Sequence, residues 1–213
     1  MKIRHVHHNF TKALNPRKLT DAIVIHHQAG MNPNTAAGIH DMHIRQRGWA
    51  GIGYNFYIWT NGTIETGRPI DMQGAHAGPK ANNRSIGICL QGNLDITPPE
   101  PAQLESLVWL IGQHIHPRYG KIGITGHNDY MSTSCPGRFF PMERVKKMIE
   151  EGHKLQVNGR EVTVPVKNEG GRIMLKVQGE TRLVWVQARD LAESLGGHIE
   201  WDHASKTARM VIR

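Results

Sequence analysis

Short apolar segments alternate with amphipathic ones over the first 151 residues, and this alternation limits the fold more than any other feature. The segments that we interpret as buried strands are Ala22–His26, Ser85–Gln91 and Ile122–Thr125. Glu100–His116 and Phe139–Glu151 carry apolar residues at helical spacing. Strands that alternate with helices are typical of α/β domains. We therefore expect a mixed central β-sheet flanked by helices.

One more helix is expected in the segment AAGIHDMHIRQRG, which follows the capping pair Asn34-Thr35. On this helix, the spacing predicts that Ile39 and Met42 face the core. His40 and His43 are interpreted as surface residues, because a histidine on a helix is more often solvated than buried.

The character of the chain changes near Gly152. The following residues form short β-type segments with turns, interrupted by one expected helix at Gln187–Leu195. A length of 213 residues suits one good-sized core and a small second domain. We therefore predict a domain at 1–152 that carries the chemistry and a β-rich module at 153–213. The second module contains no cluster of catalytic residue types, so we interpret it as a binding or stabilising unit.

The chain is basic, because 26 Lys and Arg against 18 Asp and Glu give a net charge of +8. This charge favours anionic partners, of which nucleic acid and an anionic cell wall are two. The basic residues are scattered and no nucleic-acid-binding motif is present, so nucleic acid is the less favoured partner. No apolar run is long enough for a membrane span, and the amino terminus lacks the apolar stretch of a secretory signal. We expect no membrane insertion and a location in the cytoplasm of the producing cell.

The stretch ITGHNDYMSTSCP contains the clearest candidate site. His127 lies eight residues before Cys135, and Thr133 lies between them. Imidazole and thiolate are zinc ligands, and a catalytic zinc site usually takes three protein ligands and one water. The best candidate for the third ligand is His26, which ends a predicted strand. A lone Cys is usually a small buried hydrophobe and a lone His is usually a polar side chain without metal, but the joint pattern favours a site.

Other residue types give weaker signals. Trp49 either lines a substrate groove or packs in the core, and the sequence does not separate these alternatives. Cys89 lies in a predicted central strand, so its simplest role is a core residue. A disulfide between Cys89 and Cys135 would remove a proposed ligand, and a chain without a secretory signal is expected in a reducing compartment. We therefore expect two free thiols.

Five motifs in this order resemble those of the zinc-dependent N-acetylmuramoyl-L-alanine amidases, the group that includes phage amidase-type lysozymes and peptidoglycan recognition proteins. The motifs are VIHH (24–27), GYNFYI (53–58), GAHAG (74–78), NNRSIGICLQGN (82–93) and GHNDYMSTSCPG (126–137). The resemblance covers most of residues 20 to 150. It implies the amidase fold, one Zn²⁺ per chain and peptidoglycan as the partner.

The resemblance also implies roles for single residues. The residues that fall on the family's metal ligands are His26, His127 and Cys135. Tyr54 and Thr133 fall on catalytic positions, and His76 falls on a histidine near the substrate groove. We expect His76, Trp49 and Asn83 to bind substrate. Cys89 stands where some wall amidases have a glutamate, so a glutamate base is not expected there, and Cys135 argues against the cytosolic recycling enzymes, which have Asp as the third ligand.

The end of the chain resembles the small amino-terminal stalk domain of some copper amine oxidases, on the segments VNGREV, VWVQARDLAESLGGHIEWD and TARMVI. This likeness implies a stalk-like module and no copper chemistry.

These resemblances imply hydrolysis of the amide between N-acetylmuramic acid and L-alanine. An enzyme that cuts cell wall but lacks a secretory signal suits a phage or prophage endolysin, which waits in the host cytoplasm until a holin releases it, and we expect a monomer. The first alternative is a non-catalytic module that binds peptidoglycan, and the second is a basic nucleic-acid binder.

Overall fold

The structure is a computed structural model. It describes residues 3–29, 35–151, 154–157, 160–162, 166–169, 172–178, 183–195, 197–202 and 207–211. The chain divides into two compact units, with the division between Lys147 and Met148. The expected boundary residue Gly152 and the capping residue Asn34 lie outside the described residues.

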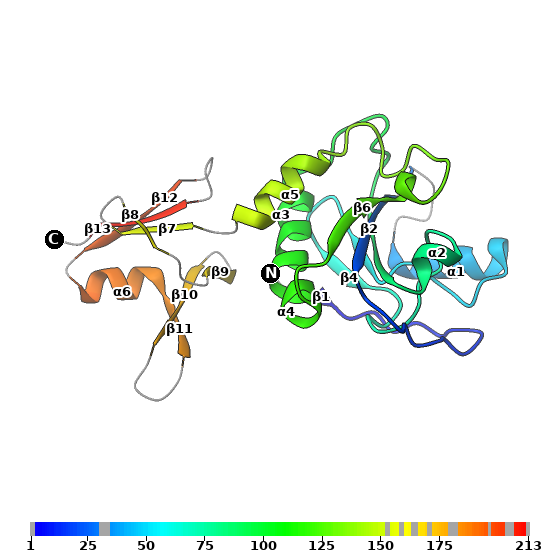
Figure 1. The fold of residues 1–213 in the computed structure, drawn as a ribbon, viewed down its shortest axis with the longest axis horizontal. Helices are drawn as coiled ribbons and strands as arrows, with labels where there is room; N and C mark the ends of the chain where they lie inside the picture. Colours follow the sequence, from blue (N-terminus) through cyan, green and yellow to red (C-terminus); the bar gives the residue numbers. More distant parts are fainter. Residues whose placement is uncertain are drawn as a thin grey trace. The chain divides into compact units, whose positions relative to one another are not determined.

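The larger unit is built on a six-stranded mixed sheet (Figure 1). The strands in spatial order are β1 (Ile3–Arg4), β4 (Ile64–Thr66), β3 (Phe56–Ile58), β5 (Ser85–Leu90), β2 (Ala22–His27) and β6 (Gly123–Gly126). The strands β3, β5, β2 and β6 are parallel, and β4 runs antiparallel to β3. Every residue of β2 and β5 is buried, which is the pattern of parallel strands covered on both faces.

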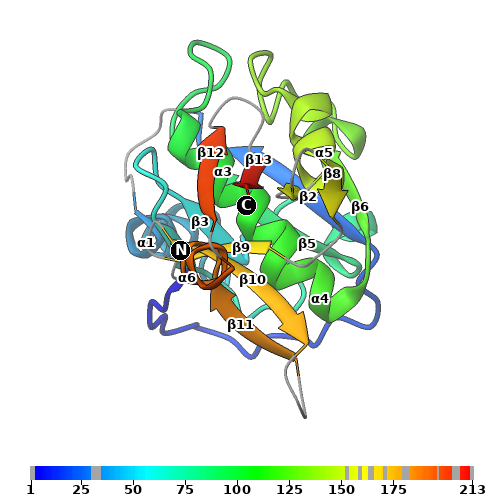
Figure 2. The ribbon, with the colours of Figure 1, turned by 90° about the vertical axis from the view of Figure 1, so that its left-hand side faces the viewer.

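Helices cover both faces of this sheet (Figures 1 and 2). On one side lie α1 (Ala36–Arg47) and α2 (Pro79–Asn82). On the other side lie α3 (Pro101–Leu110), the π-helical turn η1 (Ile111–Ile115), α4 (His116–Tyr119) and α5 (Met142–Glu151). The predicted mixed sheet flanked by helices is therefore confirmed. Among the described residues, no helix combines the length and the apolar character that a membrane span needs.

The helix ends follow local chemistry. Thr35 caps α1, because its hydroxyl accepts a hydrogen bond from the Gly38 amide at 3.0 Å. Helix α5 begins at Met142, three residues later than the sequence pattern predicts. Pro141 accounts for this difference, since the residue before a proline disfavours helical backbone angles.

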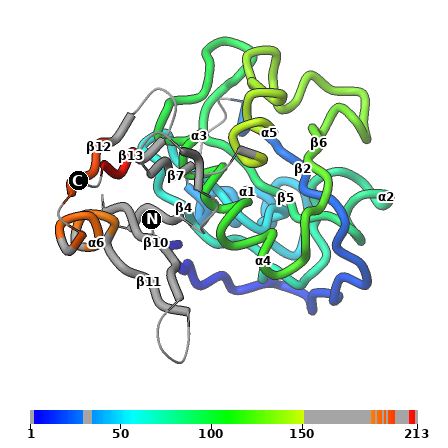
Figure 3. The backbone as a smooth tube through the Cα atoms, turned by 60° about the vertical axis from the view of Figure 1, so that its left-hand side comes forward, coloured from blue at the N-terminus to red at the C-terminus, as the bar shows by residue number. Residues whose placement is uncertain are grey.

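His40 and His43 are buried, so their interpretation as surface residues was wrong. Their side chains leave the residues only 5% and 6% exposed. The amino-terminal segment packs on α1, because the His8 and Phe10 rings lie 4.7 Å and 5.1 Å from the His40 ring. Figure 3 draws this segment in dark blue where it leads into β2. The His40 ring bonds the Asn9 carbonyl through Nε2 at 3.1 Å and accepts from the Ile52 amide through Nδ1 at 3.2 Å. Both nitrogens of the His40 ring therefore have partners inside the protein.

From residue 154 onward, the described part of the smaller unit contains two sheets and one helix. Its three-stranded antiparallel sheet consists of β9 (Val166–Glu169), β10 (Arg172–Gln178) and β11 (Leu183–Gln187). Its four-stranded sheet has the order β12 (His198–Asp202), β13 (Thr207–Val211), β7 (Lys154–Val157) and β8 (Arg160–Val162). The helix α6 (Ala188–Ser194) buries Ala188 and Ala192. One helix among short strands is the content predicted for this module.

Candidate metal centre

The sheet register brings two imidazoles together. Strands β2 and β6 are parallel, and Ile25 pairs with Gly126. The residue that follows each member of this pair is a histidine, His26 on β2 and His127 directly after β6. The two histidines therefore meet at the same edge of the sheet, with ring centroids 4.5 Å apart. His127 begins a short 3-10 turn, η2 (His127–Asp129), in which the Asp129 carboxylate accepts from the Gly126 amide at 2.8 Å. This bond fixes the turn that presents the His127 ring.

The loop after η2 returns Cys135 to the same place. The Asn128 amide donates to the Cys135 carbonyl at 2.9 Å, and the Cys135 amide donates to the Thr133 hydroxyl at 3.2 Å. The thiol lies 3.7 Å from Nδ1 of His26, and the His27 amide points at the sulfur from 3.4 Å. Local turns therefore hold the sulfur against the end of β2.

His26, His127 and Cys135 each offer a ligand atom, and these three atoms lie within 4.8 Å of one another. Burial lowers the pKa of His26 and of His127, so both imidazoles are neutral, as metal ligands must be. Burial raises the pKa of the Cys135 thiol to about 11, so its thiolate needs a nearby cation at neutral pH. The buried Nε2 of His127 has no hydrogen-bond partner among the described residues. Two neutral imidazoles, one thiol and an unpartnered ring nitrogen fit a zinc ion.

His76 supports the His26 ring. Nδ1 of His76 lies 3.0 Å from Nε2 of His26, on the side of the ring opposite Cys135. Two glycines make room for this contact, because a Cβ atom at Gly87 would lie 2.5 Å from the His76 ring, and one at Gly74 would also collide with it. His76 is buried, and its backbone amide donates to the Asn82 side chain at 2.9 Å. Such a bond to the far nitrogen orients a metal-binding histidine.

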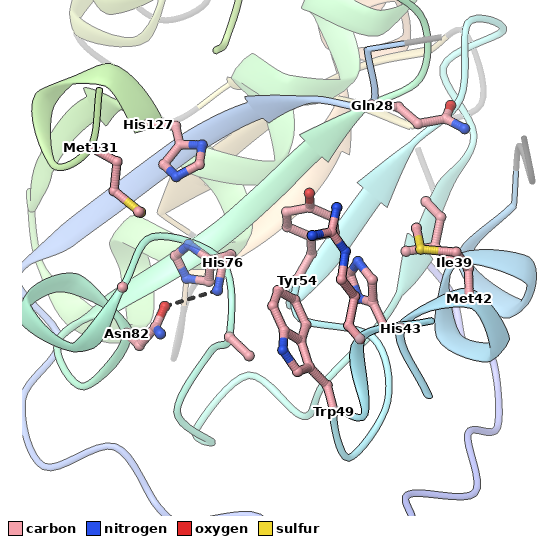
Figure 4. A pocket seen from close by; sticks show the side chains of 13 residues that line it. Gln28, Ile39, Met42, His43, Trp49, Tyr54, His76, Asn82, His127 and Met131 are labelled. Carbon is pink, nitrogen blue, oxygen red and sulfur yellow. Dashed lines mark hydrogen bonds between the residues drawn. The ribbon is translucent and has the colours of Figure 1, made fainter. Parts of the chain in front are cut away.

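A pocket of about 540 Å³ opens beside this cluster (Figure 4). Figure 4 shows His127, His76, Met131 and Asn82 on one side and Tyr54, Trp49 and His43 on the other. The described lining residues are Gln28, Ile39, Met42, His43, Arg47, Trp49, Tyr54, Ala75, His76, Gly78, Asn82, His127 and Met131. No carboxylate is among them, and Arg47 contributes a positive charge. The lining suits an amphipathic or anionic ligand.

The residues predicted for catalysis and substrate binding are distributed unevenly around this pocket. Tyr54 lines it, with its ring centroid 5.1 Å from that of His26. Trp49 also lines it and is 38% exposed, and its ring packs against His43, so its role in substrate binding stays a prediction. Thr133 is exposed and contacts the site through the Cys135 amide. Asn83 is exposed and is not among the lining residues, because the pocket side of this turn is taken by Asn82.

His43 and Gln28 are two of the lining residues for which the sequence analysis predicted no functional role. His43 accepts from the Gly53 amide at 3.0 Å and packs on the Trp49 ring, with ring centroids 4.7 Å apart. Gln28 accepts from the Tyr57 hydroxyl at 2.8 Å. His43 stands four residues after the core residue Ile39 on the same helix, so the helical spacing could have predicted that His43 is buried. The sequence around Gln28 gave no comparable indication of its position in the pocket.

A strand edge that presents two histidines and a cysteine to an open pocket defines a candidate zinc centre on a mixed α/β fold. The family model described as N-acetylmuramoyl-L-alanine amidase matches residues 15–138, which is more than half of the chain. The chain belongs to this family.

Individual relatives agree with that assignment. The chain is 33% identical over 128 residues to the endolysin of Enterobacteria phage T3, which covers 57% of this chain and 83% of that protein. It is 33% identical over 127 residues to peptidoglycan recognition protein 1 of Bos indicus, over 54% of this chain and 65% of that protein. The chain thus spans just under two thirds of that relative.

Solved structures share the fold of the larger unit. The endolysin amidase LysCS of Clostridium intestinale URNW is 37% identical with a TM-score of 0.65, and the likeness covers 70% of this chain and 95% of that one. A Drosophila PGRP-LB mutant in complex with tracheal cytotoxin is 28% identical with a TM-score of 0.57, over 63% of this chain and 85% of that one.

Proposed function

We propose that this chain is a zinc-dependent N-acetylmuramoyl-L-alanine amidase, which hydrolyses the amide between the lactyl group of N-acetylmuramic acid and L-alanine in peptidoglycan. The convergence of His26, His127 and Cys135 beside an open pocket carries the proposal. Family membership and the amidase relatives support the reaction.

His26, His127 and Cys135 would hold one Zn²⁺. Bound there, zinc supplies a water of lowered pKa and polarises the scissile carbonyl. Since Nδ1 of His26 faces the sulfur, its Nε2 carries the proton and donates to Nδ1 of His76. His76 therefore acts as a positioning residue that fixes the orientation of the His26 ring.

Tyr54 and Thr133 would stabilise the tetrahedral intermediate. The Tyr54 phenol stands in the pocket next to His26, where its hydroxyl can donate to the developing oxyanion. The Thr133 oxygen already accepts from the Cys135 amide, which leaves the hydroxyl hydrogen to donate. Each donor would lower the activation free energy of hydrolysis by about 2–4 kcal/mol.

Trp49 and His76 would contact the glycopeptide, and Arg47 would attract a carboxylate of its peptide stem. The exposed indole offers an apolar face at the pocket rim, and arginine pairs well with carboxylates. Asn83 is proposed to contact substrate only outside the pocket, since it does not line it.

We further infer a role as a phage or prophage endolysin that acts as a monomer on the cell wall after release from the host cytoplasm. The phage endolysins among the relatives support this role. The smaller unit, which resembles a stalk domain, would bind the wall or stabilise the chain.

Metal analysis of a ligand variant tests the centre. Cys135→Ser should lose most of its zinc and its wall-lysing activity while circular dichroism stays that of the parent, because two imidazoles alone bind zinc weakly. Cys89→Ala is the matched thiol control, and its zinc content should stay at one per chain. If the Cys135→Ser protein cleared peptidoglycan at the parent rate, the assignment of Cys135 as a zinc ligand would be wrong.

Product analysis separates the amidase from a non-catalytic binding module. Mass spectrometry of digested wall should show newly exposed L-alanine amino termini and intact glycan strands. Wall that is bound but uncut by zinc-loaded protein would favour the binding module. A mobility-shift assay without salt-dependent binding would dismiss the nucleic-acid alternative.

A further inference from the structure

A second pocket of about 510 Å³ lies in the larger unit, and the amidase chemistry does not use it. Its wall is formed by the amino-terminal segment, the β3–β4 region and the π-helical turn η1. Six of its lining residues carry basic side chains, namely His5, His7, His8, Arg68, His114 and Arg118. No lining residue among the described part of the chain is acidic.

Arg68 is the unusual member of this set. The residue is 7% exposed, so it is more than nine-tenths buried as a whole. Its Nε donates to the Ile52 carbonyl at 2.7 Å, and its Nη1 donates to the Gln73 carbonyl at 2.9 Å. Nη2 makes no hydrogen bond to any residue that the structure describes, and no described carboxylate pairs with the group. A buried charge without a counter-ion is costly.

The neighbouring charges do not compensate Arg68. Asp71 is engaged by Arg118 and by the Tyr119 hydroxyl, which donates to it at 2.6 Å. Glu65 is engaged by Arg4 at 3.4 Å and by the Ala36 amide at 3.1 Å. Both carboxylates are thus held by other partners, and the positive charge that faces the pocket without a counter-ion is that of Arg68.

Aromatic side chains surround Arg68 and the lining imidazole of His114. The Arg68 guanidinium lies over the Phe10 ring, with Cζ 6.0 Å from the centroid. The π-helical turn carries His114, whose ring stands perpendicular to that of Phe56 at 5.9 Å. Phe10 and Phe56 both line the pocket, so a charged ligand would have apolar walls that exclude water.

We propose that this second pocket binds a small oxyanion of the phosphate or phosphate-ester class, with the free Nη2 edge of Arg68 as the principal contact. The basic lining residues come from the amino-terminal segment, the turn after β4 and the helical segment 111–119. Basic groups on separate segments suit phosphate, whose oxygens point in all directions, better than carboxylate, whose two oxygens lie in one plane. Free inorganic phosphate and the phosphate ester of an anionic wall polymer share this chemistry. The inference does not depend on the amidase activity.

Nuclear magnetic resonance of the Arg68 side chain tests the proposal on the zinc-loaded full chain. The Nε–H group is held by the Ile52 carbonyl, so its resonance should be observable. Titration with inorganic phosphate should shift this resonance saturably, and acetate should bind more weakly. Equal or tighter binding of glycerol 3-phosphate supports an ester ligand, and binding of inorganic phosphate alone supports the free ion. No saturable shift, or acetate binding as tight as phosphate, overturns the proposal.

Two neighbouring variants provide a matched control. His114→Glu places a carboxylate in the pocket and should weaken phosphate binding about tenfold or more through charge repulsion. Gln113→Glu adds a carboxylate one residue away, at an exposed position that does not line the pocket, and should leave the affinity nearly unchanged. Equal weakening of phosphate binding in both variants would mean that only the net charge of the protein matters, and it would overturn the proposed site.

Discussion

Tyr54 and His43 face the same pocket, and burial changes their pKa values in opposite directions. It raises the pKa of the Tyr54 phenol and lowers the pKa of His43 to about 4. Both side chains are therefore neutral at neutral pH. The phenol keeps its proton for donation, and the imidazole keeps a lone pair, which accepts from the Gly53 amide.

Removal of the Tyr54 hydroxyl should slow hydrolysis without loss of zinc. Tyr54→Phe should lower kcat about 10²-fold, the loss typical of one oxyanion donor, with zinc content unchanged. Tyr119→Phe is the control, because that hydroxyl bonds Asp71 outside the pocket. An unchanged kcat for Tyr54→Phe would remove the phenol from the mechanism.

His43 should make the stability of the larger unit depend on pH. Its pKa falls from 6.5 to about 4 on folding, so the unfolded chain binds the extra proton first as the pH drops. Stability should therefore decrease from about pH 6.5 down to about pH 4, with a loss of about 2 kcal/mol between about pH 7 and about pH 5.

Urea denaturation of zinc-free protein, compared with His43→Gln, measures this contribution. Glutamine keeps a side-chain acceptor for Gly53 but does not titrate, and the other histidines contribute equally to both proteins. The variant should lose about 2 kcal/mol less over the same interval. Parallel pH profiles of the two proteins would refute the role of His43.

At the scale of elements, a buried carboxylate links the start of helix α1 to the sheet. Glu65 on β4 accepts from the Ala36 amide at the start of α1, and it also pairs with Arg4 of β1. The side chain is only 3% exposed. This contact sets the helix start, and α1 in turn carries His40, His43 and the pocket-lining residue Arg47.

Loss of this carboxylate should destabilise the larger unit. Glu65→Ala leaves a buried amide without an acceptor and should cost about 2 kcal/mol of unfolding free energy. Glu143→Ala removes an exposed carboxylate that pairs with Lys146 and should cost no more than about 0.5 kcal/mol. Chemical denaturation gives both values. Equal losses would show that Glu65 has no special structural role.

At the scale of the whole molecule, the candidate zinc centre, both pockets and all their lining residues belong to the larger unit. We therefore expect the larger unit to carry the proposed chemistry by itself. If the smaller unit binds the wall, its removal should weaken binding to the wall and leave the catalytic rate on soluble substrate nearly unchanged.

A chain that ends after helix α5, at Gly152, tests this separation. It should retain zinc and cleave soluble muropeptides at nearly the parent rate. The reason is that it keeps all of the compact unit Lys2–Lys147, including the buried core residue Val145 of α5. Its binding to insoluble wall in a pull-down assay should fall several-fold. Undiminished wall binding would leave the smaller unit with a stabilising role only, which thermal denaturation of the two chains would reveal.

Much of this fold was predictable because its signals are local. The β2 and β5 segments are apolar along their length, and the long helix has regular spacing, so fold class followed from pattern alone. The loop between His127 and Cys135 is short, and its turns fix the distance between the two ligands. The likeness to known amidases supplied Tyr54 and His76, for which spacing gave no independent argument.

By itself, the sequence determined the strand–helix order, the change of character near residue 152 and the pair His127 and Cys135, because each depends on neighbours along the chain. The sequence named His26 as the candidate third ligand, and the tertiary structure supplies the reason that it meets His127, which is the register of two parallel strands. The tertiary structure also buried His40 and His43 and left Arg68 without a counter-ion. Those outcomes arise from segments far apart in sequence that pack together, and no local pattern encodes which segment covers which face.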